Sequence, residues 1–425
     1  MTTPGHSCQR FHESERPADR ARFSPVTAFL DLRGSGGRKD GGMSRAFALH
    51  AALTAAVLGL GVGIAPAAAS DTTGAAPADT ARTPAWRIAD IKDRGHYDWL
   101  DEVVATGPAN AWAFGGSLSD AGSVPTAERW NGTSWKKVPL PAGLERPISA
   151  ANASGPRNVW AFGGSDFAGE AFALRWNGRT WSVSKRWPSG ELITDAVVLS
   201  RRDVWVFGGS RVGPGVGTWR FDGRTWTQVE TPPGTLAGAD AVAADDIWAV
   251  GTAPTGYDMV AHWDGRTWSK VDLPDLPEED DHSVGFFDIR AQSPHDVWVV
   301  GFEYQASEEN YTETPLALHF DGTSWRRVQV PDIGARSLRQ AIPDGRGGVW
   351  FISGTDQPYE APELLHYANG RWTTARPQRP DGKAVLVYDL TTVPRSPRLW
   401  AVGEVFPVDR ASADSAIWKH GRLTR

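Results

Sequence analysis

Apolar and polar positions along this chain repeat in a unit of about 50 residues that recurs seven times. Each unit contains a short apolar run that holds a tryptophan and leads into glycine. The tryptophans of these runs are Trp112, Trp160, Trp205, Trp248, Trp298, Trp350 and Trp400. A unit of this length without helical periodicity cannot bury its own faces, so it must pack against its neighbours. The spacing therefore predicts the blades of a β-propeller.

A second pattern in each unit predicts a β-hairpin. An aromatic residue precedes Asn-Gly or Asp-Gly, and another tryptophan follows, as in the stretch from His262 to Trp268. Both residues of a two-residue hairpin turn have positive φ, which these residue types adopt most readily. The apolar run is expected to be a short strand bounded by Gly, and an earlier apolar run such as 286–289 supplies one more strand. Each unit thus predicts four antiparallel strands.

The seventh unit stops near Gly421 without its fourth strand. Residues 84–90, which include Trp86, resemble the missing piece. An unpaired edge strand invites aggregation, so we expect this N-terminal strand to complete the last blade. The predicted fold class is all-β: a seven-bladed β-propeller of four-stranded antiparallel blades over residues 84–425, with the ring closed by the N-terminal strand in blade 7.

The residues before the repeat predict export. Residues 1–42 carry no periodicity, and we interpret them as an over-extended gene model or a disordered tail. Residues 43–69 combine Arg45, an apolar run and an Ala-rich cleavage motif, which predicts a secretory signal peptide. The alternative is a single transmembrane anchor. Residues 70–83 are small and polar, as in a flexible linker, and the expected localisation is secreted or extracellular.

Composition narrows the chemistry. Of the 21 tryptophans, most recur at equivalent positions, and we expect them to fill the wedges between blades. The one cysteine, Cys8, precedes the predicted cleavage site, so the mature chain would have neither a disulfide nor a thiolate metal site. The net charge of −6 argues against nucleic acid as a partner.

Strands that end in Gly-Gly, at 161–164 and 206–209, are followed by an aromatic residue, a turn and a tryptophan. This order is similar to the kelch repeat of the kelch-type and galactose-oxidase-like β-propellers, and the similarity covers residues 84–425. It implies a propeller but no single function, because such folds host adhesion modules, scaffolds and oxidases. A copper radical oxidase would need a Cys cross-linked to a Tyr, so the resemblance implies a bacterial secreted member that is not an oxidase.

Aligned on the tryptophans, the first strand of most units carries an acidic residue that should face the central channel. This channel ring comprises Glu102, Asp195, Asp240, Asp288 and Asp389, with Ala150 and Gln340 in the other two units. Each carboxylate could accept a backbone N–H of the neighbouring blade and fasten the blades together. The alternative is an acidic funnel that holds a hard cation such as Ca²⁺. The sequence does not decide whether a metal is bound.

An Arg or His precedes the aromatic residue of the third strand in six units, as at Arg220 and His262. Residues that recur once in each blade lie far apart around the ring, so they do not converge on one metal ion. We therefore expect hydrogen bonds between blades at these positions.

Irregular loops of blades 4 to 6 hold four of the seven tyrosines and the densest acidic run. Loops on the rim of a repeat fold are free of packing constraints, and they commonly carry the binding function. The predicted ligand-binding residues are Tyr257, Asp258, Glu278, Asp281, Tyr304, Glu308, Tyr311 and Tyr359. Tyrosines among carboxylates suit recognition of a protein or a polysaccharide. The alternative is a solvated acidic rim onto which the tyrosines fold.

These patterns favour a secreted, non-catalytic binding module that recognises a protein or glycan through the loop face of blades 4 to 6. We expect a monomer that has no cofactor and does not insert stably in a membrane after signal cleavage. The alternative is a propeller-based carbohydrate-active hydrolase that uses carboxylates of the channel or rim. A hydrolase would need two carboxylates about 5 to 10 Å apart, and the sequence contains no nucleophile elbow, zinc-ligand run or phosphate-binding loop.

Overall fold

The structure is a computed structural model of the whole chain. It describes residues 86–93, 97–119, 122–164, 170–189, 192–209, 215–274, 276–307, 310–332, 337–354, 364–407 and 412–421. The predicted gene-model extension, signal peptide and linker (1–42, 43–69 and 70–83) lie outside these residues. Within the described ranges, no helix has the length and apolarity to cross a membrane.

The described strands form seven four-stranded antiparallel sheets. Blades 1 to 3 consist of β2 (Tyr97–Gly107), β3 (Asn110–Ser119), β4 (Gly122–Trp130) and β5 (Trp135–Lys137); β6 (Ile148–Gly155), β7 (Asn158–Gly163), β8 (Glu170–Trp176) and β9 (Trp181–Ser189); and β10 (Asp195–Ser200), β11 (Asp203–Phe207), β12 (Trp219–Phe221) and β13 (Trp226–Gln228). Blades 4 and 5 consist of β14 (Thr235–Ala243), β15 (Asp246–Thr252), β16 (Asp258–Trp263) and β17 (Trp268–Val271); and β18 (His282–Ser293), β19 (Asp296–Ala306), β20 (Tyr311–Phe320) and β21 (Trp325–Arg327). Blade 6 consists of β22 (Ser337–Pro343), β23 (Val349–Gly354), β24 (Leu364–Ala368) and β25 (Arg371–Ala375), and blade 7 of β26 (Lys383–Thr392), β27 (Leu399–Pro407), β28 (Asp414–His420) and β1 (Arg87–Lys92).

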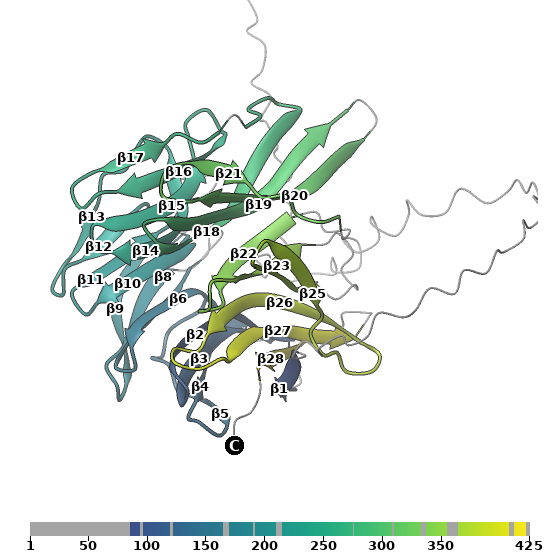
Figure 1. Cartoon of the computed structure of the whole chain (residues 1–425). Helices are drawn as coiled ribbons and strands as arrows, with labels where there is room; N and C mark the ends of the chain where they lie inside the picture. Colours follow the sequence, from purple (N-terminus) through teal and green to yellow (C-terminus); the bar gives the residue numbers. More distant parts are fainter. Residues whose placement is uncertain are drawn as a thin grey trace, which may run out of the picture.

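The predicted fold class is confirmed, including the closure of the ring. Blade 7 has the strand order β26-β27-β28-β1, and β1 pairs antiparallel with β28 from Arg87, opposite Lys419, to Lys92, opposite Ser415. Figure 1 shows the seven sheets arranged around a common centre, with the first and last strands side by side. The start and the end of the repeat therefore share one sheet, which leaves no blade incomplete.

Aromatic side chains fill the spaces between blades, as predicted. Trp112 of blade 1 is fully buried, and its ring lies 4.9 Å from Trp176 and 5.1 Å from Trp181 of blade 2. The same contact closes the ring, where Trp400 of blade 7 lies 5.1 Å from Trp130 and 5.2 Å from Trp135 of blade 1. Edge-to-face and tilted pairs at these distances are favourable beyond their buried area. The core is thus a series of wedges, each shared by two neighbouring blades.

The turn between the third and fourth strands differs from the prediction in most blades. In blade 6, Asn369 and Gly370 both have positive φ, as a two-residue turn requires. In blade 1 only Gly132 does, and the side chain of Asn131 accepts backbone N–H bonds from Thr133 and Ser134. Asn and Asp often form this local turn because their side chains reach backbone two residues on. The Asn-Gly sequence therefore forms two kinds of turn in this protein. In blade 6 both turn residues have positive φ, whereas in blade 1 hydrogen bonds to the side chain of Asn131 stabilise the turn.

The predicted end of the second strand at the glycine after the tryptophan is confirmed in blades 2 and 3, where β7 ends at Gly163 and β11 ends just before Gly208, but it is wrong in blades 1 and 5. β19 continues through Gly301 to Ala306, and β3 continues through Gly115 to Ser119. A β-bulge in the first strand faces this glycine: the pairing shifts between Phe286 and Asp288 in blade 5. A Cβ on Gly301 would lie 1.8 Å from the carbonyl oxygen of Gly285, so no side chain fits. The glycine allows the close approach of two strands at a bulge.

Five of the six periodic Arg and His residues form side-chain hydrogen bonds within their own blades; the exception is Arg175. Arg220 in β12 donates two hydrogen bonds, of 2.7 and 2.9 Å, to Asp203 in β11 of the same sheet. The Nε2 atom of His262 in β16 lies 2.8 Å from an oxygen of Asp246 in β15. The prediction of interblade bonds is wrong because the acceptor stands at the start of the neighbouring strand, two residues before the tryptophan. This pair joins the second and third strands of a blade.

Candidate functional site

The first strand of each blade lines the channel. The pairing of this strand with the second strand fixes the position of each acidic residue along the channel, which we call its level. Asp195 pairs with Phe207 and Asp288 with Val300, each two residues after the tryptophan of the second strand. Glu102 and Asp389 have equivalent partners in Phe114 and Val402. These four carboxylates therefore lie at one level of the ring.

Asp240 does not belong to this level, so the predicted alignment is wrong for blade 4. It pairs with Trp248 itself, and Gly238 occupies the position equivalent to Asp195. Asp240 lies eight residues before its tryptophan, whereas Asp195 lies ten before Trp205. Because side chains alternate along a strand, two residues keep Asp240 on the same face but move it one step along the channel. The shorter spacing between Asp240 and Trp248 therefore already indicated in the sequence that Asp240 lies at a different level of the channel.

Four of the carboxylates accept a backbone N–H from the next blade. The donors to Asp195, Asp240, Asp288 and Asp389 are Ala239 (2.9 Å), Ala291 (3.0 Å), Ala341 (2.9 Å) and Val103 (2.6 Å), respectively. The last of these bonds crosses from blade 7 to blade 1. A buried acceptor without a partner would cost free energy, and these bonds satisfy both sides. They therefore fasten neighbouring blades, as the first interpretation of the ring proposed.

Arg290 is a channel residue that the sequence reasoning missed. It follows Asp288 by two positions on β18 and therefore points to the same face, and its Nε atom lies 3.2 Å from an oxygen of Asp288. The charges of Asp288, Asp240, Asp195 and Asp389 raise the pKa of its guanidinium above the ordinary value, although burial opposes them. The alignment considered acidic residues alone. A search for any charged residue on the first strand would have found Arg290.

One guanidinium does not offset five carboxylates. Burial raises the pKa of Asp288 to about 7 and that of Asp195 and of Asp389 to about 6, against the opposing charge of Arg290. Burial and the charge of Asp389 raise the pKa of Glu102 well above its ordinary value. Since burial disfavours the charged form, part of this ring holds protons near neutral pH.

No group of three or more His, Cys, Asp or Glu residues in the described ranges has the arrangement of a metal site. Calcium at the channel or rim stays a prediction. A rise in melting temperature with calcium, reversed by chelation, would support it.

Three strands of blade 5 extend beyond the rest of the sheet and carry two of the predicted tyrosines. We call residues 281–286, 302–306 and 311–315 the blade 5 extension. Tyr304 pairs with Ser283 on one side and with Glu313 on the other, and its ring lies 5.9 Å from that of Tyr311. The side chain of Tyr311 is 48% exposed. In Figure 1, β19 and β20 project away from the propeller. The structure thus places an accessible aromatic pair on a strand scaffold.

The predicted tyrosine surface is divided by this extension. Trp298 and Val300 pack with blade 6, whereas Val297 and Val299 pack with blade 4. The pairing of β19 with β20 has no register shift. Because side chains alternate along a strand, the side chain of Tyr304 lies on the same face as those of Trp298 and Val300, which is the face toward blade 6.

Tyr257 and Asp258 come from the preceding blade. Asp258 accepts a backbone N–H from Phe286 at 2.6 Å and a hydroxyl hydrogen bond from Thr252 at 3.3 Å. Asp258 therefore anchors blade 4 to blade 5. The structure brings Tyr304 and Tyr311 together but leaves Tyr257 and Asp258 on the blade 4 side.

Two acidic residues of the prediction lie at the outer end of the blade 5 extension. Glu278 forms an isolated bridge with Ser283, and the carbonyl oxygen of Asp281 accepts the N–H of Ala306 at 2.7 Å. Both side chains are exposed. Glu308 and Tyr359 lie outside the described residues.

A charged network on the other face of the extension was not predicted. Glu303 bonds to His282 of β18 at 2.6 Å and to Arg327 of β21. Burial raises the pKa of Glu303, but the hydrogen bonds from Arg327 and His282 outweigh it, so the pKa lies below its ordinary value. The network joins strands β18, β19 and β21, which should stiffen the base of the extension.

No protein-family model matches the sequence, and no curated protein is similar in sequence. Solved structures match over most of the chain. A structure described as YCF48 bound to a D1 peptide is 13% identical with a TM-score of 0.50, and the match covers 81% of this chain and 99% of that one. The β-propeller domain of Cps50 (Swd1) from Myceliophteria thermophila is 11% identical with a TM-score of 0.51, over 78% and 99%.

A PL25 polysaccharide lyase, an ulvan lyase bound to -[GlcA(1-4)Rha3S]-, is 10% identical with a TM-score of 0.50, over 76% of this chain and 94% of that one. At these identities, the likeness shows the β-propeller fold alone. Proteins of different activities share it, so function must be argued from the site.

Proposed function

We propose that this protein is a non-catalytic binding module that recognises a protein or glycan through the blade 5 extension. The observation that carries the proposal is the pair formed by Tyr304 and Tyr311. Their ring centroids lie 5.9 Å apart, and Tyr311 is about half exposed. Tyrosine presents a broad apolar face and a polar hydroxyl at a small cost in conformational entropy, and it is enriched in binding hot spots.

The scaffold beneath the pair supports this proposal. Tyr304 lies on the middle strand of three, with continuous pairing on both sides. A ligand that binds a preformed surface loses less of its binding free energy to the ordering of the protein. Exposed carboxylates at Glu278 and Asp281 would favour a partner with basic or hydroxyl groups. The YCF48 structure contains a bound peptide and the ulvan lyase structure a bound saccharide, so both partner classes have precedents on this fold.

The hydrolase alternative has less support. Four of the five acidic residues offered for catalysis at the channel accept backbone hydrogen bonds from a neighbouring blade. A general acid must be free to give its proton to a substrate, and these carboxylates are committed to the scaffold. The raised pKa values of the ring follow from burial and are explained without a substrate.

The test replaces Tyr304 and Tyr311 by Ala in one variant. Folding should be retained, because Tyr311 is exposed and Tyr304 is only partly buried, and surface substitutions usually change stability by no more than about 0.5 kcal/mol. Binding should weaken by about 1 kcal/mol or more for each ring, which together is a factor of about 30 in Kd. A glycan array and a peptide array with the wild-type propeller identify the ligand, and calorimetry then compares the variants.

The matched control replaces Gln305 and Thr312, which lie on the same hairpin but on its blade 4 side, by Ala. These changes should leave Kd within a factor of about two, because the residues lie away from the aromatic pair. If the double tyrosine variant binds as tightly as the wild type, the ligand site lies elsewhere and the channel ring becomes the leading candidate.

We also propose that the protein is exported, on the basis of the signal-like residues 43–69. N-terminal sequencing of protein from the culture medium should find Ser70 as the first residue. Detection of residues 1–42 on the exported protein would contradict the proposed start and cleavage. Membership in the kelch-type propellers remains a proposal that rests on the Gly-Gly strands and the aromatic-turn-tryptophan order.

A further inference from the structure

Most blades pair an acceptor at the start of the second strand with a cation or His on the third strand. The acceptor stands two residues before the tryptophan in blades 1, 3, 4 and 5: Asn110 with Arg129, Asp203 with Arg220, Asp246 with His262, and Asp296 with His319. In blade 6, Asp344 takes the role for His366. In blade 2, Asn158 stands at the position and accepts from Trp160. Each of these six blades thus offers an oxygen acceptor here.

Blade 7 breaks this rule. Arg398 stands two residues before Trp400, where blades 1 to 5 place Asn or Asp, and Lys419 pairs with Trp400 as Arg220 pairs with Trp205. Arg87 of β1 lies directly opposite Lys419 and adds another cation. Like charges opposite one another in a sheet are unfavourable. Among the described residues, neither the guanidinium of Arg398 nor the ammonium of Lys419 has a carboxylate or another hydrogen-bond acceptor as a partner.

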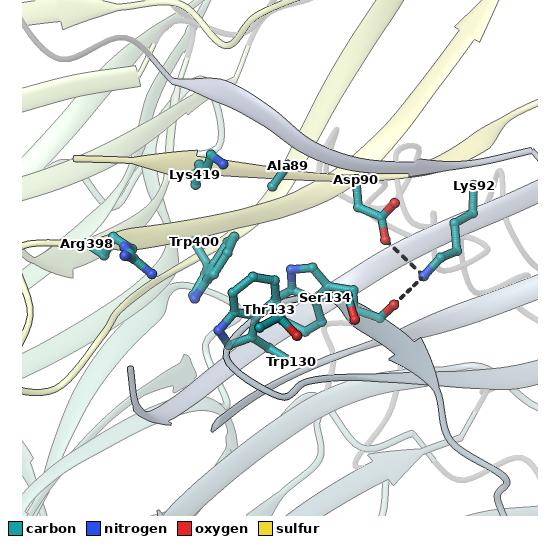
Figure 2. Close-up of a pocket in the computed structure, with 10 residues that line it drawn as sticks. Ala89, Asp90, Lys92, Trp130, Thr133, Ser134, Arg398, Trp400 and Lys419 are labelled. Carbon is teal, nitrogen blue, oxygen red and sulfur yellow. Dashed lines mark hydrogen bonds and ion pairs between the residues drawn. The ribbon is translucent and has the colours of Figure 1, made fainter. Parts of the chain in front are cut away.

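These two cations line a cavity of about 250 Å³ at the seam between blades 7 and 1. Figure 2 shows Arg398, Lys419 and Trp400 at one end of the cavity, Trp130, Thr133 and Ser134 along one side, and Lys92 and Asp90 at the other end. Trp130 is only partly buried, so a part of its indole ring is available to a ligand. The cavity is assembled from both ends of the repeat and from the first hairpin.

The electrostatics of the cavity favour a negative ligand. Lys92 forms ion pairs with Asp90 at 2.9 Å and with the buried Glu128, so these acids are already neutralised in part. Three cations and one carboxylate line the cavity, in a protein whose net charge is −6. A guanidinium offers a planar fork of donors that matches the two oxygens of a carboxylate, sulfate or phosphate group.

We propose that the cavity between blades 7 and 1 is an oxyanion site, in which Arg398 and Lys419 bind a carboxylate, sulfate or phosphate group of a small ligand. The anion would serve as the acceptor for Arg398 and Lys419, as Asp203 serves as the acceptor for Arg220 in blade 3. The volume suits a ligand of about one sugar unit, and the partly exposed face of Trp130 suits the apolar side of a sugar ring. This site is separate from the blade 5 extension and does not depend on the proposed function.

The location of the site links binding to closure of the ring. Arg398 and Lys419 belong to the C-terminal strands, Ala89 and Lys92 to β1, and Trp130 to blade 1. A ligand that binds only the closed ring stabilises it by mass action. An oxyanion should therefore raise the melting temperature through this one cavity.

The experiment measures binding of inorganic sulfate, inorganic phosphate and D-glucuronate by calorimetry at constant ionic strength, with D-glucose as the neutral control. Arg398→Asp rebuilds the acid and cation pair of the other blades, so this variant should fold as stably as the wild type and bind anions at least tenfold more weakly. Lys419→Met should also lose binding. Arg179→Asp makes the same change of charge on an exposed turn of blade 2 and should bind as the wild type does.

The three anions distinguish the sources of the oxyanion: the tightest of them identifies a carboxylate, a sulfate or a phosphate ligand. In parallel, the anion should raise the melting temperature of the wild type and of Arg179→Asp but not that of Arg398→Asp. This comparison removes the general stabilising effect of sulfate, which acts on all variants alike. Absence of saturable binding for all three anions, or equal affinity in Arg398→Asp, would overturn the proposal. Equal binding of glucose and glucuronate would overturn it as well.

Discussion

At the scale of single residues, the most unusual feature is the channel, where the five carboxylates of the channel ring lie with the guanidinium of Arg290 among the described residues. Four of them serve as acceptors between blades, and Arg290 supplies the compensating charge. The desolvation of charges that this arrangement imposes is costly unless a group takes up a proton. The channel should therefore make the stability of the protein depend on pH.

Asp288→Asn tests this dependence. The pKa of Asp288 in the folded protein is about 7, whereas an unfolded Asp has a pKa of about 3.9. Between these values, the folded protein holds a proton that the unfolded chain has lost. The contribution of Asp288 to stability is therefore complete below about pH 4 and is lost as the pH rises through 7. Asn does not titrate and can still accept the N–H of Ala341.

Denaturant unfolding at pH 5 and pH 8 measures the effect. The free energy of unfolding should fall less between these pH values in Asp288→Asn than in the wild type, by about 1 kcal/mol or more. Asp272→Asn, at an exposed position, serves as the control and should follow the wild type. Parallel curves for the wild type and Asp288→Asn would show that the channel aspartate titrates normally.

At the scale of strands, a bulge in the first strand and a glycine in the second form one unit. The pairing shifts by one residue at this place in blades 1, 2, 4, 5, 6 and 7. A Cβ on the facing glycine would overlap a carbonyl oxygen in five of these: at Gly115, Gly163, Gly251, Gly301 and Gly403. Blade 6 has Ser353 instead. In blades 1, 5 and 7 the acidic residue of the channel ring is the first paired residue after the bulge, so the glycine of the second strand lies close to the level of the ring.

Gly301→Ala should be strongly destabilising. The new methyl group would lie 1.8 Å from the oxygen of Gly285, and both atoms belong to or adjoin backbone that has little freedom to move. Overpacking of this kind costs about 1 to 3 kcal/mol. Thermal unfolding measures the loss. Gly107→Ala is the control, because its Cβ would meet no atom within 4 Å. A melting temperature unchanged in Gly301→Ala would mean that the bulge relaxes freely.

At the scale of the whole molecule, one strand from the start of the repeat closes the ring. Trp86 is fully buried in a cluster with Trp350 and Trp418, and Ile88 and Ile91 of β1 pack against the same cluster. This cluster lies between blades 6 and 7, whereas the hydrogen bond from Val103 to Asp389 and the contacts of Trp400 with blade 1 cross the seam between blades 7 and 1. Closure therefore depends on apolar burial, on strand pairing and on one buried hydrogen bond.

Removal of residues 1–92 should open the ring. The loss of Trp86 alone should cost about 3 to 5 kcal/mol, and the exposed edge of β28 should promote aggregation. The control chain begins at Pro84 and keeps β1, so it should melt as the full chain does. Thermal unfolding and size-exclusion chromatography distinguish the two chains. Equal melting temperatures and equal solubility would contradict the role of β1 in closure.

The sequence by itself determined the number of blades, the four strands of each blade and the closure of the ring. These features are local or periodic: a hairpin signal spans a few residues, and the same sequence pattern recurs in each blade. The matching segment around Trp86 was visible because it resembles the fourth strand of the other blades. The sequence also indicated correctly that tryptophans fill the wedges, since large rings at equivalent positions serve the same packing in each blade.

The tertiary structure alone decided where charged residues meet. Asp240 and Arg290 share a channel with Asp389, which lies 149 and 99 positions away from them in the sequence. The blade 5 extension separates Tyr257 from Tyr304 because side chains of a strand alternate between its two faces. Arg398, Lys419 and Trp130 come from opposite ends of the repeat and line one cavity only because the ring closes there. Electrostatic and packing partners are set by distance in space, which a periodic sequence leaves open until the ring is formed.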